Sequence, residues 1–237
     1  MDTYGKLYLI PTRLGDNPPL EVLPISIKKT IEYIDNYIVE NEKTARRFIK
    51  RVTPSKSQPS LKIKVLNKYT NIEERNTFLN PCLVGVSVGL LSEAGCPAIA
   101  DPGADIVRLA HEMNIRVVPL VGPSSITLAL MASGMNGQNF AFNGYLPIDK
   151  TERKSKLKSL ERISSEQNQT QIFIETPYRN NKLLDDMIAI LQPNTKVCVA
   201  CDITLPTEYI KTMSAKEWKN KKEDLHKRPA IFILKKD

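Results

Sequence analysis

The stretch from Ser92 to Gly103, Ser-Glu-Ala-Gly-Cys-Pro-Ala-Ile-Ala-Asp-Pro-Gly, constrains the fold of this chain more than any other. An apolar run over residues 83–91 precedes it and predicts a buried strand, and residues 104–113 follow it with the pattern of a helix. Strand, Gly/Pro-rich loop and helix in this order are typical of α/β proteins, which bind ligands at the carboxyl ends of their strands. Gly95 and Gly103 allow sharp turns or a close approach of the backbone to a ligand, although a tight turn without a ligand would use the same residues.

Glycine is concentrated around this stretch. Eight of the 10 glycines lie between Gly85 and Gly144, and none follows Gly144. Asp101 and Pro102 suit the N-cap and the first position of the helix. We therefore expect the middle third of the chain to bind a ligand.

The charge balance favours an anionic partner. The chain has 34 Lys and Arg against 26 Asp and Glu, a net charge of +8. The basic residues cluster over 46–56, 150–158 and 219–228. One such cluster is usually a solvated surface, but three together favour a phosphate-bearing substrate such as nucleic acid.

Composition is that of an ordinary globular protein, with 41% apolar and 25% charged residues in 237, enough for one large domain or two small ones. The apolar runs are too short for a membrane span, and the first residues do not resemble a signal peptide. Four cysteines are too few for a disulfide framework in a chain of this length. We expect a cytoplasmic protein.

Strands and helices alternate in the first half, which predicts a mainly parallel sheet. Residues 37–39 suit either the end of a helix that Ser26 caps or a short strand. The second half has more strands in succession and predicts a mixed sheet. The fold class is therefore α/β, with domains expected at 1–121 and 122–237. The remaining expected elements are strands at 4–10, 61–65, 115–121, 140–142, 171–175, 196–200, 208–212 and 230–234, and helices at 44–51, 72–79, 124–133, 149–162, 176–191 and 214–217.

The sequence lacks the residues that several kinds of catalytic site require. Cys198 and Cys201 form a Cys-x-x-Cys without a second pair or a nearby histidine, so they are expected to be core cysteines and no metal site is expected. His111 and His226 are the only histidines, and Gly-x-Ser-x-Gly, Walker A and Gly-x-Gly-x-x-Gly motifs are lacking. A crevice with few ionisable groups suits chemistry in which a cofactor supplies the reactivity. S-adenosylmethionine fits, because in-line methyl transfer needs mainly proximity and alignment.

The motifs resemble those of the tetrapyrrole (class III) methyltransferase superfamily, and within it the branch that methylates a cytidine ribose 2′-OH of bacterial small-subunit ribosomal RNA. Ser92–Gly103 resembles that branch's Ser-Asp-Ala-Gly-Thr-Pro-x-Ile-Ser-Asp-Pro-Gly. Residues 121–125 with 132–134 resemble its Pro-Gly-Pro-Ser-Ala and Ala-Ser-Gly. Residues 142–147 are similar to its Phe-x-Gly-Phe-Leu-Pro, and 173–179 to its Phe-Tyr-Glu-Ser-Pro-His-Arg.

This resemblance implies a two-domain α/β fold with S-adenosylmethionine in the cleft between the domains of a homodimer. The cofactor contacts that it implies, many of them through backbone atoms, are Pro11, Gly95, Cys96, Pro97, Ile99, Ser124, Ser125, Glu175 and Pro229.

The substrate side departs from the pattern of the branch. Residues 12–16 are Thr-Arg-Leu-Gly-Asp in place of Thr-Pro-Ile-Gly-Asn, and residues 40–43 are Glu-Asn-Glu-Lys in place of Glu-Asp-Thr-Arg. The His-Glu-His-Asn stretch is not visible near residues 68–71, and residues 201–204 lack an arginine. The resemblance therefore favours methyl transfer more strongly than it favours ribosomal RNA.

The expected function is methylation of a ribose 2′-OH of small-subunit ribosomal RNA with S-adenosylmethionine. A ribose hydroxyl is a poor nucleophile, so Glu93 and Glu40 are candidate catalytic residues. Lys43 and Arg179 are candidates for binding the phosphates of the substrate. Two alternatives remain open: methylation of a tetrapyrrole or another small acid, and a module without turnover that binds RNA or a protein partner.

Overall fold

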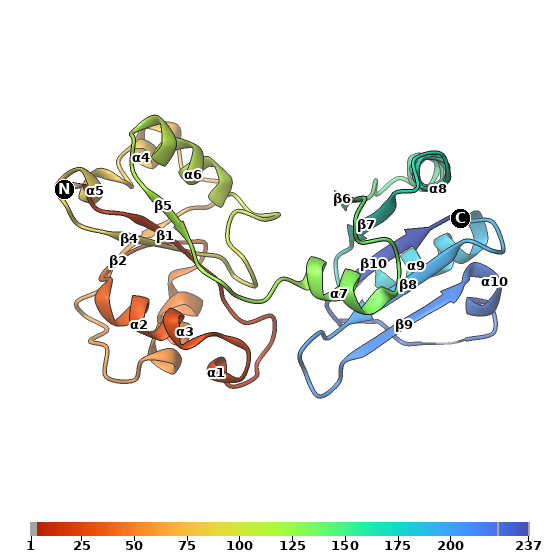
Figure 1. Cartoon of the computed structure of the whole chain (residues 1–237), viewed down its shortest axis with the longest axis horizontal. Coiled ribbons are helices and arrows are strands. Elements are labelled where there is room, and N and C mark those ends of the chain that lie inside the picture. The colour runs from red at the N-terminus through yellow and green to blue at the C-terminus, as the bar shows by residue number, and fades with distance from the viewer. Residues whose placement is uncertain (1–3, 222, 237) are drawn as a thin grey trace. The chain divides into compact units, whose positions relative to one another are not determined.

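The computed structural model describes residues 4–221 and 223–236 (Figure 1). Contacts divide the chain into two compact units, Met1–Ser124 and Ser125–Asp237. Each unit has one five-stranded sheet with helices against it. That residues 1–121 and 122–237 are separate domains stays a prediction. None of the helices within the described residues combines the length and the hydropathy that a membrane span requires.

The first unit has a parallel sheet with the strand order β3-β2-β4-β1-β5. All four pairings are parallel, and Leu7 of β1 lies opposite Val88 of β4 on one side and Val117 of β5 on the other. The prediction of a parallel sheet is confirmed. The strands are β1 (Leu7–Ile10), β2 (Asn36–Val39), β3 (Lys62–Val65), β4 (Val88–Leu91) and β5 (Val117–Pro119).

Helices cover both faces of this sheet (Figure 1). One face packs against α1 to α3, with Ile27 and Ile49 at its centre, and the other against α5, α6 and the segment before α5, with Phe78 and Ile106 at its centre. A sheet that is buried on both faces explains the continuous apolar strands. The helices are α1 (Pro19–Val22), α2 (Ile25–Tyr33), α3 (Glu42–Val52), α4 (Ile72–Asn76), α5 (Asn80–Leu83) and α6 (Gly103–Glu112).

Three local predictions in this unit were wrong. The strand expected over 83–91 begins only at Val88, because residues 80–83 form the short helix α5 and Val84 is exposed. Ser26 does not cap α2, which begins after Pro24. Of the two alternatives for residues 37–39, the short strand is confirmed. Helix α3 begins two residues early, because Asn41 Oδ1 accepts the N–H groups of Lys43 and Thr44.

The second unit has a mixed sheet with the order β6-β7-β10-β8-β9. Strands β6 and β7 pair in parallel and the other pairs are antiparallel, as the sequence predicts. The strands are β6 (Phe140–Tyr145), β7 (Thr170–Ile174), β8 (Lys196–Cys201), β9 (Tyr209–Ser214) and β10 (Ala230–Lys235). The helices are α7 (Ser125–Ser133), α8 (Lys150–Glu166), α9 (Asn180–Ile190) and α10 (Ala215–Trp218).

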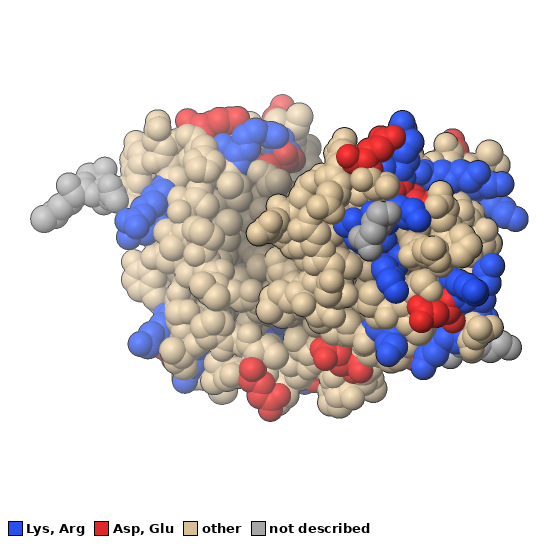
Figure 2. All heavy atoms as spheres, turned by 45° about the vertical axis from the view of Figure 1, so that its right-hand side comes forward, with Lys and Arg blue, Asp and Glu red and all other residues tan. Residues whose placement is uncertain are grey.

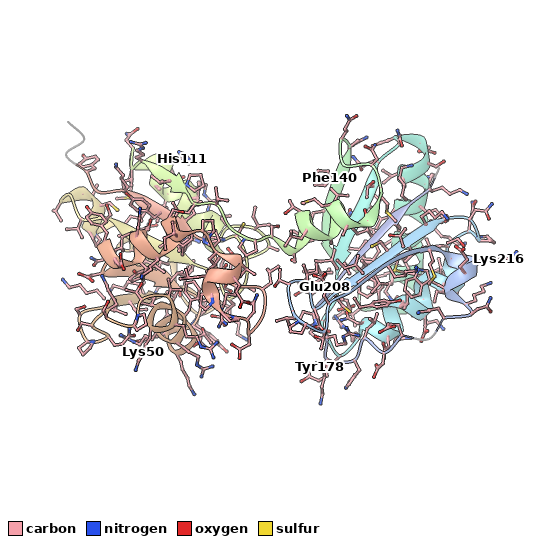
Figure 3. The ribbon with its side chains drawn as sticks, turned by 60° about the horizontal axis from the view of Figure 1, so that its bottom comes forward. Lys50, His111, Phe140, Tyr178, Glu208 and Lys216 are labelled. Carbon is pink, nitrogen blue, oxygen red and sulfur yellow. The ribbon has the colours of Figure 1, made fainter. Side chains whose placement is uncertain are left out.

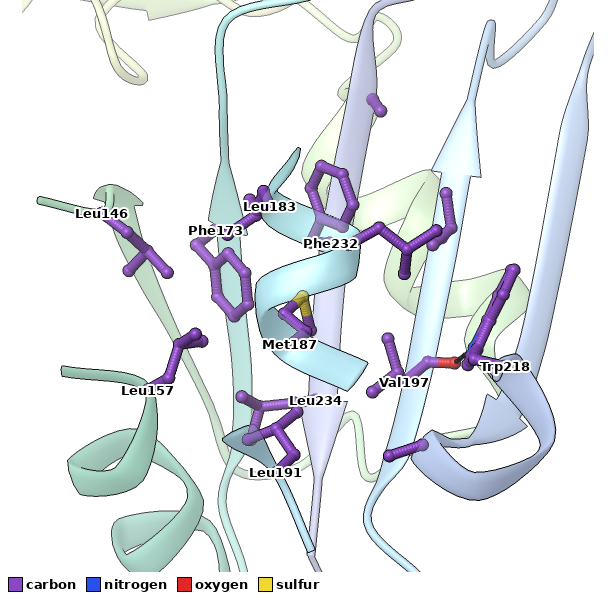
Figure 4. Packing of buried hydrophobic residues seen from close by; sticks show 14 of the residues in the cluster. Leu146, Leu157, Phe173, Leu183, Met187, Leu191, Val197, Trp218, Phe232 and Leu234 are labelled. Carbon is purple, nitrogen blue, oxygen red and sulfur yellow. Dashed lines mark hydrogen bonds between the residues drawn. The ribbon is translucent and has the colours of Figure 1, made fainter. Parts of the chain in front are cut away.

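Three aromatic side chains lie within the mainly aliphatic core of the second unit (Figure 4). The rings of Phe173 and Phe232 stack with centroids 6.2 Å apart. Trp218 is fully buried, and its indole N–H donates to the carbonyl of Val197 at 3.0 Å. A capping box of Ser214 and Glu217 starts α10, which was expected at 214–217, and α10 brings Trp218 into this core.

The predicted start of one helix in this unit was wrong. Helix α9 begins at Asn180 and not at Pro177, because Glu175 and Arg179 form an ion pair in the preceding loop. Helix α7 is apolar nearly all round but only partly buried in its unit. It packs on the sheet through Ala129 and Leu130, whereas Met131 is exposed.

Phe232→Ala should lower the free energy of unfolding of the second unit by about 3–5 kcal/mol, because it removes a buried ring and leaves a cavity. Trp218 is the sole tryptophan, so its emission during urea unfolding reports on this core. Phe140→Ala, at a ring that is 42% exposed on β6, is the matched control and should cost much less. Equal losses in the two variants would contradict the packing described.

Candidate functional site

Three loops meet at the carboxyl edge of the first sheet. They follow β1, β4 and β5. The N–H of Thr12 donates to the carbonyl of Gly95 at 2.9 Å, and its hydroxyl donates to the carbonyl of Ser92 at 3.3 Å. The thiol of Cys96 donates to the carbonyl of Pro123 at 3.4 Å, and burial raises the pKa of this thiol. Backbone carbonyls therefore accept all three of these hydrogen bonds between the loops, which lie at the ligand edge of an α/β sheet.

Two glycines make this junction possible. Gly95 has a φ of +73°, and a Cβ there would lie 3.2 Å from Leu14 and 3.3 Å from the carbonyl oxygen of Pro123. A Cβ on Gly122 would lie 2.2 Å from the Cβ of Pro11, which is closer than two carbons can approach. A side chain at Gly122 would therefore overlap Pro11, and one at Gly95 would be tightly packed on a strained backbone.

Asp101 organises the long loop after β4. Its two carboxylate oxygens accept the N–H of Ala98 at 2.9 and 3.0 Å, and Oδ1 also accepts the N–H of Gly103 at 2.7 Å. The residue in the N-cap position is Pro102, one later than predicted, but Asp101 still binds the first N–H of α6. Burial raises the pKa of Asp101, although the N–H groups of Gly103 and Ala98 oppose this shift.

The same loop holds strained backbone. Ala98 and Ala100 have φ values of +67° and +62°, a conformation that costs a residue with a Cβ free energy. Ile99 between them is 54% exposed. Strain of this kind persists where the surrounding structure imposes it, and it clusters at ligand sites. The loop therefore holds an apolar side chain at the surface beside a fixed backbone.

The two predicted catalytic carboxylates lie together at this edge. The N–H of Glu93 donates to Glu40 Oε1 at 2.9 Å. The hydroxyl of Thr44, in the first turn of α3, donates to Glu93 Oε1 at 2.6 Å. Burial raises the pKa of Glu40; the N–H of Glu93 opposes the shift, and the charges of Asp101 and Glu93 add to it. Lys43 is exposed next to Thr44.

A pocket of about 310 Å³ opens beside Glu93. Its walls are the loop after β1, one face of α3 and the end of β4. Sequence reasoning did not assign its arginines to a site. The spacing of Thr44, Arg47 and Arg51 by three and four residues was the available signal, because such residues share one face of a helix. The pocket is lined by Thr12, Arg13, Leu14, Gly15, Asp16, Thr44, Ala45, Arg47, Phe48, Arg51, Leu91, Ser92 and Glu93.

The second unit holds three of the other predicted site residues. Glu175 is buried, and its Oε1 accepts the N–H of Thr176 at 2.6 Å and the guanidinium of Arg179 at 2.6 and 3.0 Å. Arg179 therefore already has a carboxylate partner. The carbonyl of Pro229 accepts the N–H of Asp202 at 3.0 Å.

Residues 175–180 and 226–229 lie against each other in this unit. Asn180 donates to the carbonyl of Arg228 at 2.6 Å, and the N–H of Lys227 donates to the carbonyl of Pro177 at 3.0 Å. Tyr178 is exposed at the surface of the unit (Figure 3). The structure thus brings Glu175, Arg179 and Pro229 into one region.

The predicted site residues therefore fall into two groups. The first unit joins the loop residues Pro11, Gly95 and Cys96 to the carboxylates at the edge of its sheet, and its loops also carry Pro97, Ile99 and Ser124. The second unit contains Ser125, the first residue of α7, and the Glu175 region. The roles of all these residues stay predictions.

Comparison with known proteins places this chain in a family. The model of the Tetrapyrrole (Corrin/Porphyrin) Methylases matches residues 29–219. Ribosomal RNA small subunit methyltransferase I of Vibrio cholerae is 29% identical over 89% of this chain and 69% of its own. The protein with the same name in Xylella fastidiosa is 31% identical over 86% of this chain and 70% of its own. The crystal structure of the methyltransferase CobJ superposes with a TM-score of 0.65 at 11% identity, over 98% of this chain and 94% of that one.

The match of the family model over most of the chain defines the class of protein, a methyltransferase. The chain belongs to the tetrapyrrole (corrin/porphyrin) methylase family. The likeness to CobJ shows the two-part α/β fold alone, since the identity is low.

Glu40→Gln should stabilise the fold at neutral pH relative to the wild type. The pKa of Glu40 is higher in the folded chain than in the unfolded chain, so ionisation costs stability as the pH rises through this interval. An amide oxygen can still accept the N–H of Glu93, and it carries no charge. The stability advantage of the variant, measured by urea unfolding followed by circular dichroism, should be larger at pH 8 than at pH 4.

Glu21→Gln, at an exposed carboxylate of α1, is the control and should show no such dependence on pH. An advantage of Glu40→Gln that is constant with pH, or larger at pH 4, would contradict a raised pKa.

Asp101→Ala should lower the free energy of unfolding of the first unit by about 1–2 kcal/mol, because the N–H groups of Ala98 and Gly103 lose their acceptor. Hydrogen exchange at these two amides should accelerate more than at Val88 in the sheet. Unchanged exchange at both amides would show that Asp101 does not hold the loop.

Proposed function

We propose that the protein transfers the methyl group of S-adenosylmethionine to a ribose 2′-hydroxyl of small-subunit ribosomal RNA. The observation that carries the proposal is the pair Glu40 and Glu93 at the carboxyl edge of the first sheet, beside the loops that match the family pattern. The relatives named ribosomal RNA small subunit methyltransferase I support the choice of substrate.

The residues at this edge fit the cofactor. The Gly95 loop has small residues, a backbone fixed by Asp101 and an exposed apolar side chain at Ile99, which suit an adenosine and a methionine chain. The bound cofactor supplies an activated methyl group. The residues that would hold it are Pro11, Gly95, Cys96, Pro97, Ile99 and Ser124 in the first unit, with Ser125, Glu175 and Pro229 in the second. Its location in a cleft between two domains stays a prediction from the resemblance.

The chain's own chemistry is to prepare the hydroxyl. Glu93 is oriented by the hydroxyl of Thr44, which binds Oε1, so Oε2 is the oxygen that would take the proton of the 2′-hydroxyl. Glu40 fixes the backbone of Glu93 by accepting its N–H at 2.9 Å. Lys43 is exposed beside this pair, in a position to contact a phosphate of the substrate.

The charge of the chain favours RNA over a small acid. Figure 2 shows Lys and Arg side chains spread over the visible face of the second unit. Helix α8 alone exposes Lys150, Lys154, Lys156 and Lys158. Arg179, which is 35% exposed, would reach a phosphate while it keeps Glu175 as its partner. The resemblance further favours a cytoplasmic homodimer.

Methylation of a tetrapyrrole is the second candidate, favoured by the description of the matching family. Binding of a tetrapyrrole should depend on salt concentration less than binding of RNA does, because a small acid displaces few counterions whereas an RNA displaces many. A module without turnover would bind RNA equally well with and without the cofactor.

Glu93→Gln should lower the turnover number by about 100-fold or more, the range for loss of a general base. The affinity for S-adenosylmethionine, measured by calorimetry, should stay unchanged. Incorporation of labelled methyl groups into small-subunit ribosomal RNA reports turnover. Glu73→Gln, at an exposed residue of α4, is the control. Full turnover of Glu93→Gln would remove Glu93 from this role, and a wild-type protein that binds no cofactor with or without RNA would overturn the proposed function.

A further inference from the structure

The pocket beside Glu93 has a cationic end. Arg13 and Arg51 both donate to Oδ1 of Asp16, and Arg13 also donates to the carbonyl of Asn17. The side chain of Arg13 is only 12% exposed, whereas that of Asp16 is 79% exposed. Two guanidinium groups thus converge from different elements on one small anion at the mouth of the pocket. The hydrogen bonds from Arg51 and Arg13 lower the pKa of Asp16, so this anion stays ionised.

Arg47 adds a third guanidinium to the same pocket. It is exposed on α3, one turn before Arg51, and no carboxylate within residues 4–221 and 223–236 pairs with it. Lys50 on the same helix also lies at the surface (Figure 3). With Arg47, the cationic end has three guanidinium groups and the one carboxylate of Asp16, so its net charge is positive.

The two ends of the pocket differ in chemistry. Helix α3 runs along the wall from Thr44, which binds Glu93, to Arg51, which binds Asp16. Seven residues of helix span about 10 Å. Between the ends, the buried side chains of Phe48 and Leu91 give the pocket an apolar floor. A carboxylate at one end and guanidiniums at the other suit an RNA strand that places a ribose hydroxyl at the first end and a phosphodiester farther along the strand at the second.

We propose that this pocket binds a phosphodiester of the RNA strand, with Arg47 and Arg51 as its ligands and Asp16 as an internal anion that the phosphate replaces. The inference rests on the proposed function, since it places this phosphate on the same strand as the methylated nucleotide. Guanidinium groups bind phosphate in a planar, two-point geometry, and Asp16 keeps Arg13 and Arg51 oriented for it. Arg13 and Asp16 are two of the positions at which the sequence departs from the related pattern, so that pattern lacks the Arg13–Asp16 pair.

A purely structural role for Asp16 is the competing explanation. In that case the carboxylate pins the loop after β1 to α3, and its loss would loosen the pocket and weaken RNA binding. If Asp16 instead occupies the phosphate position, its loss removes a competing anion and strengthens RNA binding. Asp16→Asn therefore gives opposite results under the two explanations.

The experiment measures binding of a fluorescently labelled single-stranded RNA from the small-subunit ribosomal RNA, by anisotropy, over a range of salt concentrations. Arg47→Gln should weaken binding several-fold and reduce the slope of log affinity against log salt by about 0.7, the value for one phosphate contact of a single strand. Arg116→Gln is the matched control, because Arg116 is exposed in the same unit but precedes β5, at the other edge of the sheet. It should change neither quantity.

Asp16→Asn should strengthen RNA binding several-fold. Its matched control is Asp105→Asn, because Asp105 also bridges two arginines, Arg75 and Arg108, but lies on α6. This control should leave RNA binding unchanged. Urea unfolding of each variant confirms that the fold is retained.

The experiment tests the phosphate-binding pocket and the proposed function separately. Equal effects of Arg47→Gln and Arg116→Gln, or weaker binding by Asp16→Asn, would overturn the pocket even if the wild type methylates RNA. Tight binding of free phosphate with no binding of RNA would mark a site for a small phosphorylated acid and overturn the inference. Loss of methyl transfer to RNA in the wild type, with the Arg47 effect on RNA binding intact, would overturn the proposed function and leave the phosphate site.

Discussion

The parallel pairing of β1 with β4 and β5 is the constraint on which the rest of the first unit depends. Because the three strands run in the same direction, the chain leaves each of them at one edge and must turn there. Loops that crowd one edge have little room for side chains, and Gly122 against Pro11 shows how little. Backbone groups therefore make the contacts, and the Gly95 loop becomes a fixed surface on which a ligand can rest.

Buried negative charge is the second organising feature. Asp101 and Glu40 are both carboxylates whose pKa is raised by burial, and both accept backbone N–H groups of the loop after β4. Such groups cost the fold stability unless they are satisfied, so their retention is expected where chemistry needs them. Helix α3 places the guanidinium groups of Arg47 and Arg51 at a distance from Glu93, which gives the pocket two chemically different ends.

Much of the fold could be predicted because it depends on local patterns. The strand and helix order, the parallel first sheet, the mixed second sheet and the capping box at Ser214 all follow from apolar periodicity and capping residues. The errors arose where a local pattern was ambiguous. The apolar residues 83–86 look like the start of a strand, but the turn of α5 leaves Val84 at the surface. Thr176 and Pro177 look like a helix start, but the ion pair of Glu175 and Arg179 holds a loop there.

The sequence by itself determined the class of the protein, because the Ser92–Gly103 stretch needs a strand before it, a helix after it and glycine at Gly95. It also determined which residue types could carry the chemistry. Only the tertiary structure decided which of these residues contact one another. Glu93 and Thr44 are 49 residues apart, and Arg51 and Asp16 are 35 apart. Hydrophobic periodicity in the sequence cannot predict such pairs. They form only when the crossover connections of the parallel sheet fold α3 against the loop after β1.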